Sequence, residues 1–327
     1  MFALSEITWW PVGAKAATDA QVLRDIVYLS RSKDGNTRSW ACVTLGHLAI
    51  HRSTCNAVFA LNPCAQLVSG LTDSDVDTRC AAIYALSQIS RRVEGARAVV
   101  HVNALECTRD FLHSADAKTR RWTCKLLGNI ASHQSLFIAV LTIRPAYASV
   151  WLVALSDDRD IGVSRAAIRT LSELSYWPEG AEAAVRAKAL KHATHTLHST
   201  DAKTRRWTCT LIGRLAKHPS TSAAVLFRRP CPQLVTLLTD PDLNVCLSAL
   251  NALVEISDRK AGARATLDAK VLEQVPQLID SADPGIQGQA CVMLGKLIRH
   301  MSIKSYRLHW HVSTRMVSLL RDPDRAD

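Results

Sequence analysis

The nonapeptide DAKTRRWTC occurs twice without change, at Asp116–Cys124 and at Asp201–Cys209. Two looser copies of the surrounding segment begin at Asn36 and Gly288. A glycine inside each copy recurs every 82 to 85 residues, at Gly46, Gly128, Gly213 and Gly295. A period of this size predicts an elongated stack of similar units, in which function is carried by a surface rather than by a pocket.

A second, related series lies between these copies. Its segments end at Ser90, Ser175 and Ser257, and an alanine-rich stretch follows each of them after a glycine. The repeating unit is therefore about 41 residues long, in two alternating subtypes. Subtype A is centred on Trp40, Trp122, Trp207 and Gln289, and subtype B on Tyr84, Arg169 and Asn251.

Composition limits the class of protein. The chain has 40 Lys plus Arg against 29 Asp plus Glu, a net charge of +11, which favours an acidic partner such as a protein segment, a phosphate group or a nucleic acid. No run reaches the ~18 apolar residues that a membrane span needs, and the N-terminus lacks the layout of a signal peptide. The ten cysteines include no CxxC pair, which favours packing residues in a reducing compartment. We therefore expect an intracellular protein, in the cytoplasm or the nucleus.

Apolar spacing inside one unit predicts helices only. Positions i, i+3, i+4 and i+7 are apolar, and no stretch alternates as a strand does. The unit from residue 95 onward predicts three helices, at Gly95–Val102, Ala104–His113 and Ala117–His133. Proline is expected to open the second helix of each B unit, at Pro63, Pro145 and Pro230.

Acidic turns precede the third helices, at Asp73–Asp75, Asp157–Asp158, Asp240–Asp242 and Asp322–Asp324. A calcium loop is one interpretation of such pairs, but no glycine-containing loop with a downstream bidentate glutamate follows. Capping of the third helix by an Asp or Ser side chain is the interpretation that we favour.

The unit length and the segments Asn103–Ser114, Leu126–Ser132 and Pro230–Asp242 resemble armadillo repeats of the armadillo-type (ARM/HEAT) superfamily. The resemblance covers nearly the whole chain. It implies an all-α fold, a right-handed α-solenoid of about eight three-helix repeats, whose third helices line a concave groove. In this superfamily, importin-α adaptors, β-catenin and vacuolar armadillo scaffolds use that groove to hold protein partners.

We expect residues 1–327 to form a single repeat array with an incomplete repeat at each end. Leu4–Pro11 aligns with Leu171–Pro178, so the first residues resemble the last turns of a B-type third helix. At the other end, Val317–Asp324 stops where a third helix is due to begin.

Two sets of recurring side chains have competing interpretations. His51, His133, His218 and His300 close the third helices of the A units. Successive A units lie roughly 20 Å apart, too far to share a metal ion, so we expect the histidines to bond helix-terminal carbonyls. For Trp40, Trp122 and Trp207, burial between repeats and a ligand contact at the groove edge both stay open.

The groove is the strongest candidate site. The resemblance places a Trp and an Asn four residues apart on the third helices of importin-α adaptors, where they hold a basic peptide. Those positions here carry Lys125/Asn129, Val43/His47, Tyr84/Gln88, Arg169/Glu173, Thr210/Arg214, Asn251/Glu255 and Val292/Lys296. One turn earlier stand Arg121, Arg165 and Arg206. The central units therefore predict a basic groove for an acidic or phosphorylated segment, with Arg121, Arg165 and Arg169 beside Arg206 and Arg214 on one strip.

No nucleophile elbow, phosphate-binding loop, dinucleotide fingerprint or zinc-protease motif is present, so we expect no catalytic residue, no cofactor and no metal. The favoured function is a non-enzymatic protein-interaction scaffold. A nucleic-acid- or phosphate-binding solenoid that uses the arginine excess is the alternative. A divergent nuclear-transport adaptor comes third, because the Trp–Asn ladder is missing.

Overall fold

The computed structural model describes residues 1–142 and 147–300, and within these ranges every regular element is a helix. Two compact units, Met1–Leu174 and Ser175–Asp327, are distinguished by their internal contacts and are described separately. The expected single array over 1–327 stays a prediction. Pro145, Val317–Asp324 and the acidic turn at 322–324 lie outside the described residues.

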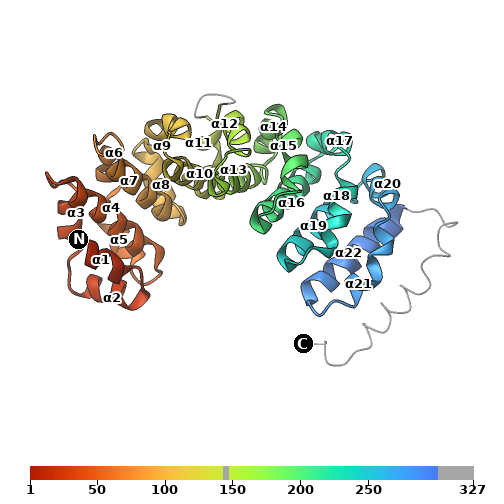
Figure 1. Cartoon of the computed structure of the whole chain (residues 1–327), viewed down its shortest axis with the longest axis horizontal. Helices are drawn as coiled ribbons and strands as arrows, with labels where there is room; N and C mark the ends of the chain where they lie inside the picture. Colours follow the sequence, from red (N-terminus) through yellow and green to blue (C-terminus); the bar gives the residue numbers. More distant parts are fainter. Residues whose placement is uncertain (143–146, 301–327) are drawn as a thin grey trace. The chain divides into compact units, whose positions relative to one another are not determined.

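The first unit is a stack of third helices that pack in chain order (Figure 1). They are α1 (Phe2–Thr8), α4 (Gly35–Ile50), α7 (Val76–Ile89), α10 (Ala117–Ala131) and α13 (Ile161–Leu174). The first and second helices of the repeats are shorter: α2 (Pro11–Asp19), α3 (Leu23–Leu29), α5 (Cys55–Ala60), α6 (Cys64–Gly70), α8 (Val93–His101), α9 (Ala104–Thr108) with the 3-10 helix η1 (Arg109–His113), α11 (Phe137–Leu141) and α12 (Tyr147–Leu155).

The second unit repeats this arrangement with three third helices, α16 (Ala202–Lys217), α19 (Leu243–Ile256) and α22 (Pro284–His300). The shorter helices are α14 (Pro178–Arg186), α15 (Ala189–Thr196), α17 (Pro219–Phe227), α18 (Cys231–Thr236) with η2 (Leu237–Thr239), α20 (Lys260–Asp268), η3 (Val271–Glu273) and α21 (Val275–Ile279). None of the helices in the described part of the chain is both long and apolar enough to cross a membrane.

The three helices expected from residue 95 onward are confirmed. The first is α8, the second is α9 continued by η1, and the third begins at Ala117 and ends at Ala131, two residues before the predicted end. Leu126, Leu127 and Ile130 of α10 are at most 2% exposed, so the apolar face of the helix supplies the core between repeats.

The repeated glycines let third helices approach closely. A Cβ on Gly46 of α4 would lie 2.7 Å from the Tyr84 ring and 3.2 Å from the Ala85 Cα of α7. A Cβ on Gly213 of α16 would lie 3.1 Å from the Ala252 Cα of α19. A larger residue would crowd these helices, which accounts for the glycine at these two positions, whereas a Cβ on Gly295 would have no described neighbour within 4 Å.

Aspartate caps open the third helices. Asp34, Asp75, Asp116 and Asp201 each accept a hydrogen bond from the backbone N–H three residues later, and Asp242 accepts one from Asn244. Capping is therefore confirmed for Asp75 and Asp242. It is wrong for Asp157–Asp158, because Asp160 is the residue that accepts from the Val163 N–H.

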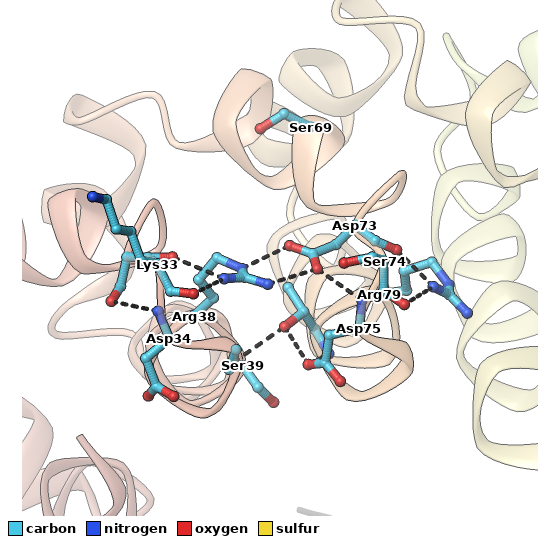
Figure 2. Close-up of polar contacts among 12 residues, drawn as sticks. Lys33, Asp34, Arg38, Ser39, Ser69, Asp73, Ser74, Asp75 and Arg79 are labelled. Atoms are coloured by element: carbon cyan, nitrogen blue, oxygen red, sulfur yellow. Dashed lines mark hydrogen bonds and ion pairs between the residues drawn. The ribbon is translucent and has the colours of Figure 1, made fainter.

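The aspartate two residues before the cap of each B-type third helix has a different role, which the sequence analysis missed. The Arg38 side chain donates from Nε and Nη2 to the Asp73 carboxylate, at 2.7 and 2.8 Å, and its Nη1 donates to the carbonyls of Ser32 and Lys33 (Figure 2). The same contacts link Arg120 to Asp158 and Arg205 to Asp240. These bidentate pairs tie the first three A repeats to the B repeats that follow them.

We expect Asp240→Asn to reduce stability at neutral pH by about 1–3 kcal/mol, because Arg205 would lose a partly buried, bidentate partner. Burial by itself would raise the pKa of Asp240, but the Arg205 guanidinium and the Asp242 N–H hold this pKa below its ordinary value. A depressed folded-state pKa contributes stability that is present above the unfolded pKa and is lost as pH falls through the folded pKa.

Urea unfolding at neutral and acid pH tests this expectation. The wild-type chain should lose more stability on acidification than the Asp240→Asn variant does. The exposed Asp268→Asn change in α20 is the control and should shift stability by less than about 0.5 kcal/mol. Equal effects of the two substitutions would contradict a structural role for the pair.

Cysteines are packing residues in this fold. All ten have free thiols, and seven of them are buried. Burial raises the pKa of Cys124 to about 12, so its thiol stays protonated at neutral pH. This confirms the interpretation of Cys124 and Cys209, which occupy equivalent repeat positions, as small apolar side chains in the core.

Candidate binding groove

Third helices α4, α7 and α10 of the first unit, with the end of α1, enclose a groove of about 700 Å³. Its aromatic wall is formed by Trp9, Trp40, His47, Tyr84 and Trp122, and we call it the aromatic groove. The rings meet edge to face: centroids are 4.9 Å apart for Trp9 and His47, 5.8 Å for His47 and Tyr84, and 4.6 Å for Tyr84 and Trp122. Such edge-to-face contacts hold the rings in place.

The recurring tryptophans are all half-buried, Trp40 and Trp122 line the aromatic groove, and a ligand contact stays a prediction. Trp122 is half-buried, its ring rests edge to face on Tyr84, and the Lys125 ammonium lies 3.9 Å from the ring centroid. Trp40 is half-buried against Phe2, with ring centroids 4.8 Å apart, and lines the groove. Trp207 is also half-buried, and the Arg206 guanidinium lies 5.4 Å from its ring.

A basic cluster adjoins the aromatic groove. It consists of Lys125 with Arg91, Arg121, Arg165 and Arg169. Burial, acting together with the positive charges of the four arginines, lowers the pKa of Lys125 to about 8. The predicted residues Arg121, Lys125, Arg165 and Arg169 thus lie within electrostatic range of one another in the first unit, and Arg91 joins them.

The Arg121 side chain lies across the start of α13, because a Cβ on Gly162 would be 3.1 Å from its Cδ. A hydrogen bond positions the Arg169 side chain: its Nη2 donates to Asn129 Oδ1 at 3.3 Å. Burial lowers the pKa of Arg169, and the nearby Glu173 carboxylate opposes that effect. Glu173 therefore offsets part of the positive charge of the cluster.

Three of the predicted groove residues, Asn129, Tyr84 and Gln88, are almost fully buried. Asn129 is 7% exposed, and its Nδ2 donates to the Ser87 carbonyl at 2.7 Å. It therefore fixes α10 against α7 and positions Arg169. Tyr84 and Gln88 are each 8% exposed, but both line the aromatic groove.

Predicted groove residues of the second unit gather around a smaller hollow of about 210 Å³. Thr210 and Arg214 of α16 line it with Asn251 and Glu255 of α19. The Arg214 guanidinium lies 5.4 Å from the Tyr176 ring. The exposed Arg206 lies one turn earlier on the same helix. The pooling of Arg206 and Arg214 with the first-unit cluster stays a prediction.

The four recurring histidines bind carbonyl groups, as predicted, but the carbonyls belong to the preceding repeat. The Nε2 atom lies 3.1 Å from a carbonyl oxygen in every case. The pairs are His51 with Thr8, His133 with Ser90, His218 with Ser175, and His300 with Asp258. Each imidazole thus closes the end of a neighbouring helix. The described residues hold no cluster of three His, Cys, Asp or Glu side chains that could bind a metal ion.

We expect the Lys125 amine to titrate near pH 8, well below the ordinary 10.5, because burial and the charges of the cluster both disfavour its charged form. In NMR of the methylated amine, Arg121→Gln should raise this pKa.

Between about pH 8 and 10 the unfolded chain would bind more protons at Lys125 than the folded one, so stability should rise with pH there. Lys125→Thr, the residue that the equivalent position 210 carries, should remove that rise. An unperturbed amine pKa would contradict the cluster.

No protein-family model and no curated protein matches this chain. Among solved structures, it is similar to an engineered protein at 25% identity, over 99% of this chain and 80% of the other, with a TM-score of 0.88. A designed armadillo repeat protein matches at 20% identity over 71% of this chain and 99% of its own, with a TM-score of 0.67. Another, in complex with the peptide (KR)4, matches at 22% identity over 71% and 98%, with a TM-score of 0.66. The chain thus has an all-α solenoid fold like that of the designed armadillo repeat proteins.

Proposed function

We propose that this chain is a non-enzymatic scaffold that binds an extended segment of a protein partner, and that acidic or phosphorylated residues of the segment contact the basic cluster. The observation that carries the proposal is the gathering of Arg91, Arg121, Arg165 and Arg169 about Lys125, whose ammonium lies 3.9 Å from the Trp122 ring centroid. The proposal assigns no catalytic step, cofactor or metal to the chain, and it places the scaffold inside the cell.

Charge pairing within the chain supports this assignment. Arg38, Arg120 and Arg205 are neutralised by aspartates of the next repeat. Arg121 and Lys125 form no ion pair with any carboxylate of the described residues. A phosphate or carboxylate group of a partner would supply the missing counter-charge through charge-assisted hydrogen bonds.

A designed armadillo repeat protein holds the basic peptide (KR)4. The basic cluster gives our chain the opposite charge preference at its own groove, because like charges across an interface are strongly unfavourable. For the same reason a nuclear-transport adaptor that carries basic signals is the weaker proposal.

A second candidate partner is single-stranded nucleic acid. Aromatic rings beside a basic strip are what bases and phosphates need for stacking and charge contacts, and the aromatic groove adjoins the basic cluster. This alternative predicts a steep fall of affinity with salt concentration.

Fluorescence anisotropy with the full chain separates the candidates. The probes are an acidic phosphoserine peptide, its unphosphorylated form, (KR)4 and a short single-stranded RNA, each at about 50 and 200 mM salt. We expect the phosphoserine peptide to bind tightest and (KR)4 not to bind. Tighter binding of (KR)4 would refute the proposal, and RNA binding that exceeds peptide binding would favour the alternative.

A further inference from the structure

We propose that the aromatic groove and the basic cluster of the first unit form one composite site for a partner segment that carries a large aromatic side chain next to a phosphorylated or acidic residue. This inference rests on the proposed function, to which it adds a second anchor. The predicted peptide therefore has two chemically different contacts, one apolar and one anionic.

The aromatic groove can accept a large side chain. Its volume of about 700 Å³ falls within the range of ligand-binding clefts. Trp9 forms its outer wall and is 53% exposed, although its ring already packs edge to face on His47. An aromatic side chain from a partner would cover the exposed part of Trp9 and would extend the existing edge-to-face series.

Two residues join the groove to the cluster. Trp122 contacts Tyr84 inside the groove and carries the Lys125 ammonium over its ring. Arg91 lines the groove and also acts on Lys125 and Arg169. A ligand whose aromatic group lies against Trp122 therefore has its neighbouring residue beside Lys125 and Arg91.

The charges of the groove lining specify an anionic neighbour. Arg91 and Lys118 line the groove, and the Asp77 carboxylate is the acidic side chain among the lining residues. With Lys125 and Arg121 just beyond, the positive charge outweighs the negative one. A segment with an aromatic residue and a basic neighbour would be repelled there, whereas a phosphorylated or acidic neighbour would be attracted.

The second unit shows which features are particular to this site. The nonapeptide that contains Trp122 is repeated around Trp207, but Lys125 is replaced there by Thr210 and Asn129 by Arg214. The repeat sequence thus keeps Trp122 and Arg121, as Trp207 and Arg206, and changes the lysine that would meet the anion. Lys125→Thr is therefore a substitution that this chain already accommodates at an equivalent position.

Four peptides test the composite site with the full chain. One carries tryptophan beside phosphoserine, two lack one of these groups through Trp→Ala or unmodified Ser, and one lacks both. We expect each single omission to weaken binding at least ~10-fold, and the two losses to multiply in the fourth peptide.

Two variants assign the anchors. Trp9→Ala should weaken only the peptides that contain tryptophan, and Lys125→Thr should weaken mainly the phosphorylated ones. Trp10→Ala is the matched control, because Trp10 is 66% exposed but does not line the groove. Circular dichroism and unfolding curves check that the variants stay folded.

The outcomes separate this inference from the proposed function. Phosphopeptide binding that depends on Lys125 but ignores both Trp9 and the peptide tryptophan would overturn the composite site and leave the scaffold proposal intact. Failure of every acidic peptide would overturn both. Self-association that Trp9→Ala abolishes, without any peptide preference, would make a second copy of the chain the occupant and would also overturn the inference.

Discussion

Replacing Gly262 by alanine is expected to destabilise the second unit by roughly 3 kcal/mol or more, because the new methyl group would overlap the backbone of the preceding helix. A Cβ on Gly262 of α20 would lie 1.8 Å from the Ile256 carbonyl oxygen and 2.8 Å from its carbon. Neither atom can move by a change of rotamer. α20 must therefore shift away from the end of α19, and the packing of Ala263 and Thr266 against the core is lost with it.

The equivalent glycine of the first unit, Gly95, has the same environment, since a Cβ there would lie 2.1 Å from the Ile89 carbonyl oxygen. Gly95→Ala should therefore destabilise the first unit in the same way. The recurrence of this glycine after each B-type third helix reflects the crossing of two helices rather than a turn conformation, since none of the glycines in the described residues has a positive φ.

Gly288→Ala in α22 is the matched control. No described atom lies within 4 Å of a Cβ there, so alanine should stabilise the helix by up to about 1 kcal/mol. Denaturant unfolding measures both effects. Hydrogen exchange of Gly262→Ala should accelerate most in α19 and α20 and less in the helices further along the unit, as expected of an array held by nearest-neighbour contacts. Equal stabilities of the two variants would contradict the close approach.

The helices were predictable because the information is local and repeated. Asp116 caps α10 within three residues, and the apolar face of that helix recurs in each A unit, so the predicted start at Ala117 is the observed one. The inter-repeat ion pairs were missed, although a usable pattern was present. Arg38 and Asp73 stand 35 residues apart, and so do Arg205 and Asp240. A charge pair that recurs at close to one repeat length indicates a contact between neighbouring repeats.

The candidate site was only partly predictable. Alignment of the repeats placed Arg121, Lys125 and Arg169 on one face, since that depends only on helical register. Arg91 and Trp9 follow the ends of third helices, so their approach to the groove depends on how neighbouring helices pack. The helical register also placed Asn129 in the groove, but its side chain donates a hydrogen bond to the Ser87 carbonyl of the adjacent helix.

Charge reversal at Arg121 should have the largest effect on binding. Arg121→Glu would remove one positive charge from the basic cluster and would place a carboxylate beside Lys125, which would then pair within the chain. Loss of charge-assisted contacts of about 1.5–3 kcal/mol, combined with the new repulsion, corresponds to roughly a 100-fold loss of affinity for the phosphoserine peptide. Arg121→Gln removes the charge without reversing it, so its affinity for the phosphoserine peptide should lie between those of Arg121→Glu and the wild type.

Arg206→Glu is the closest control, because Arg206 occupies the same position in the second copy of the nonapeptide. Arg206 is exposed, and the position one turn later carries Thr210 instead of a lysine, so this reversal should weaken binding far less. Arg31→Glu, at an exposed residue that donates to Gln66, controls for net charge alone. Arg325, the corresponding choice near the other end, lies outside the described residues.

All three reversed variants should keep the helical content of the wild type, since none of these side chains is buried in the core. Equal losses from the three reversals would mean that the attraction is only one of net charge. A loss confined to Arg206→Glu would move the binding site to the second unit, because it would show that the anion is held where Arg214 and Lys217 surround Tyr176.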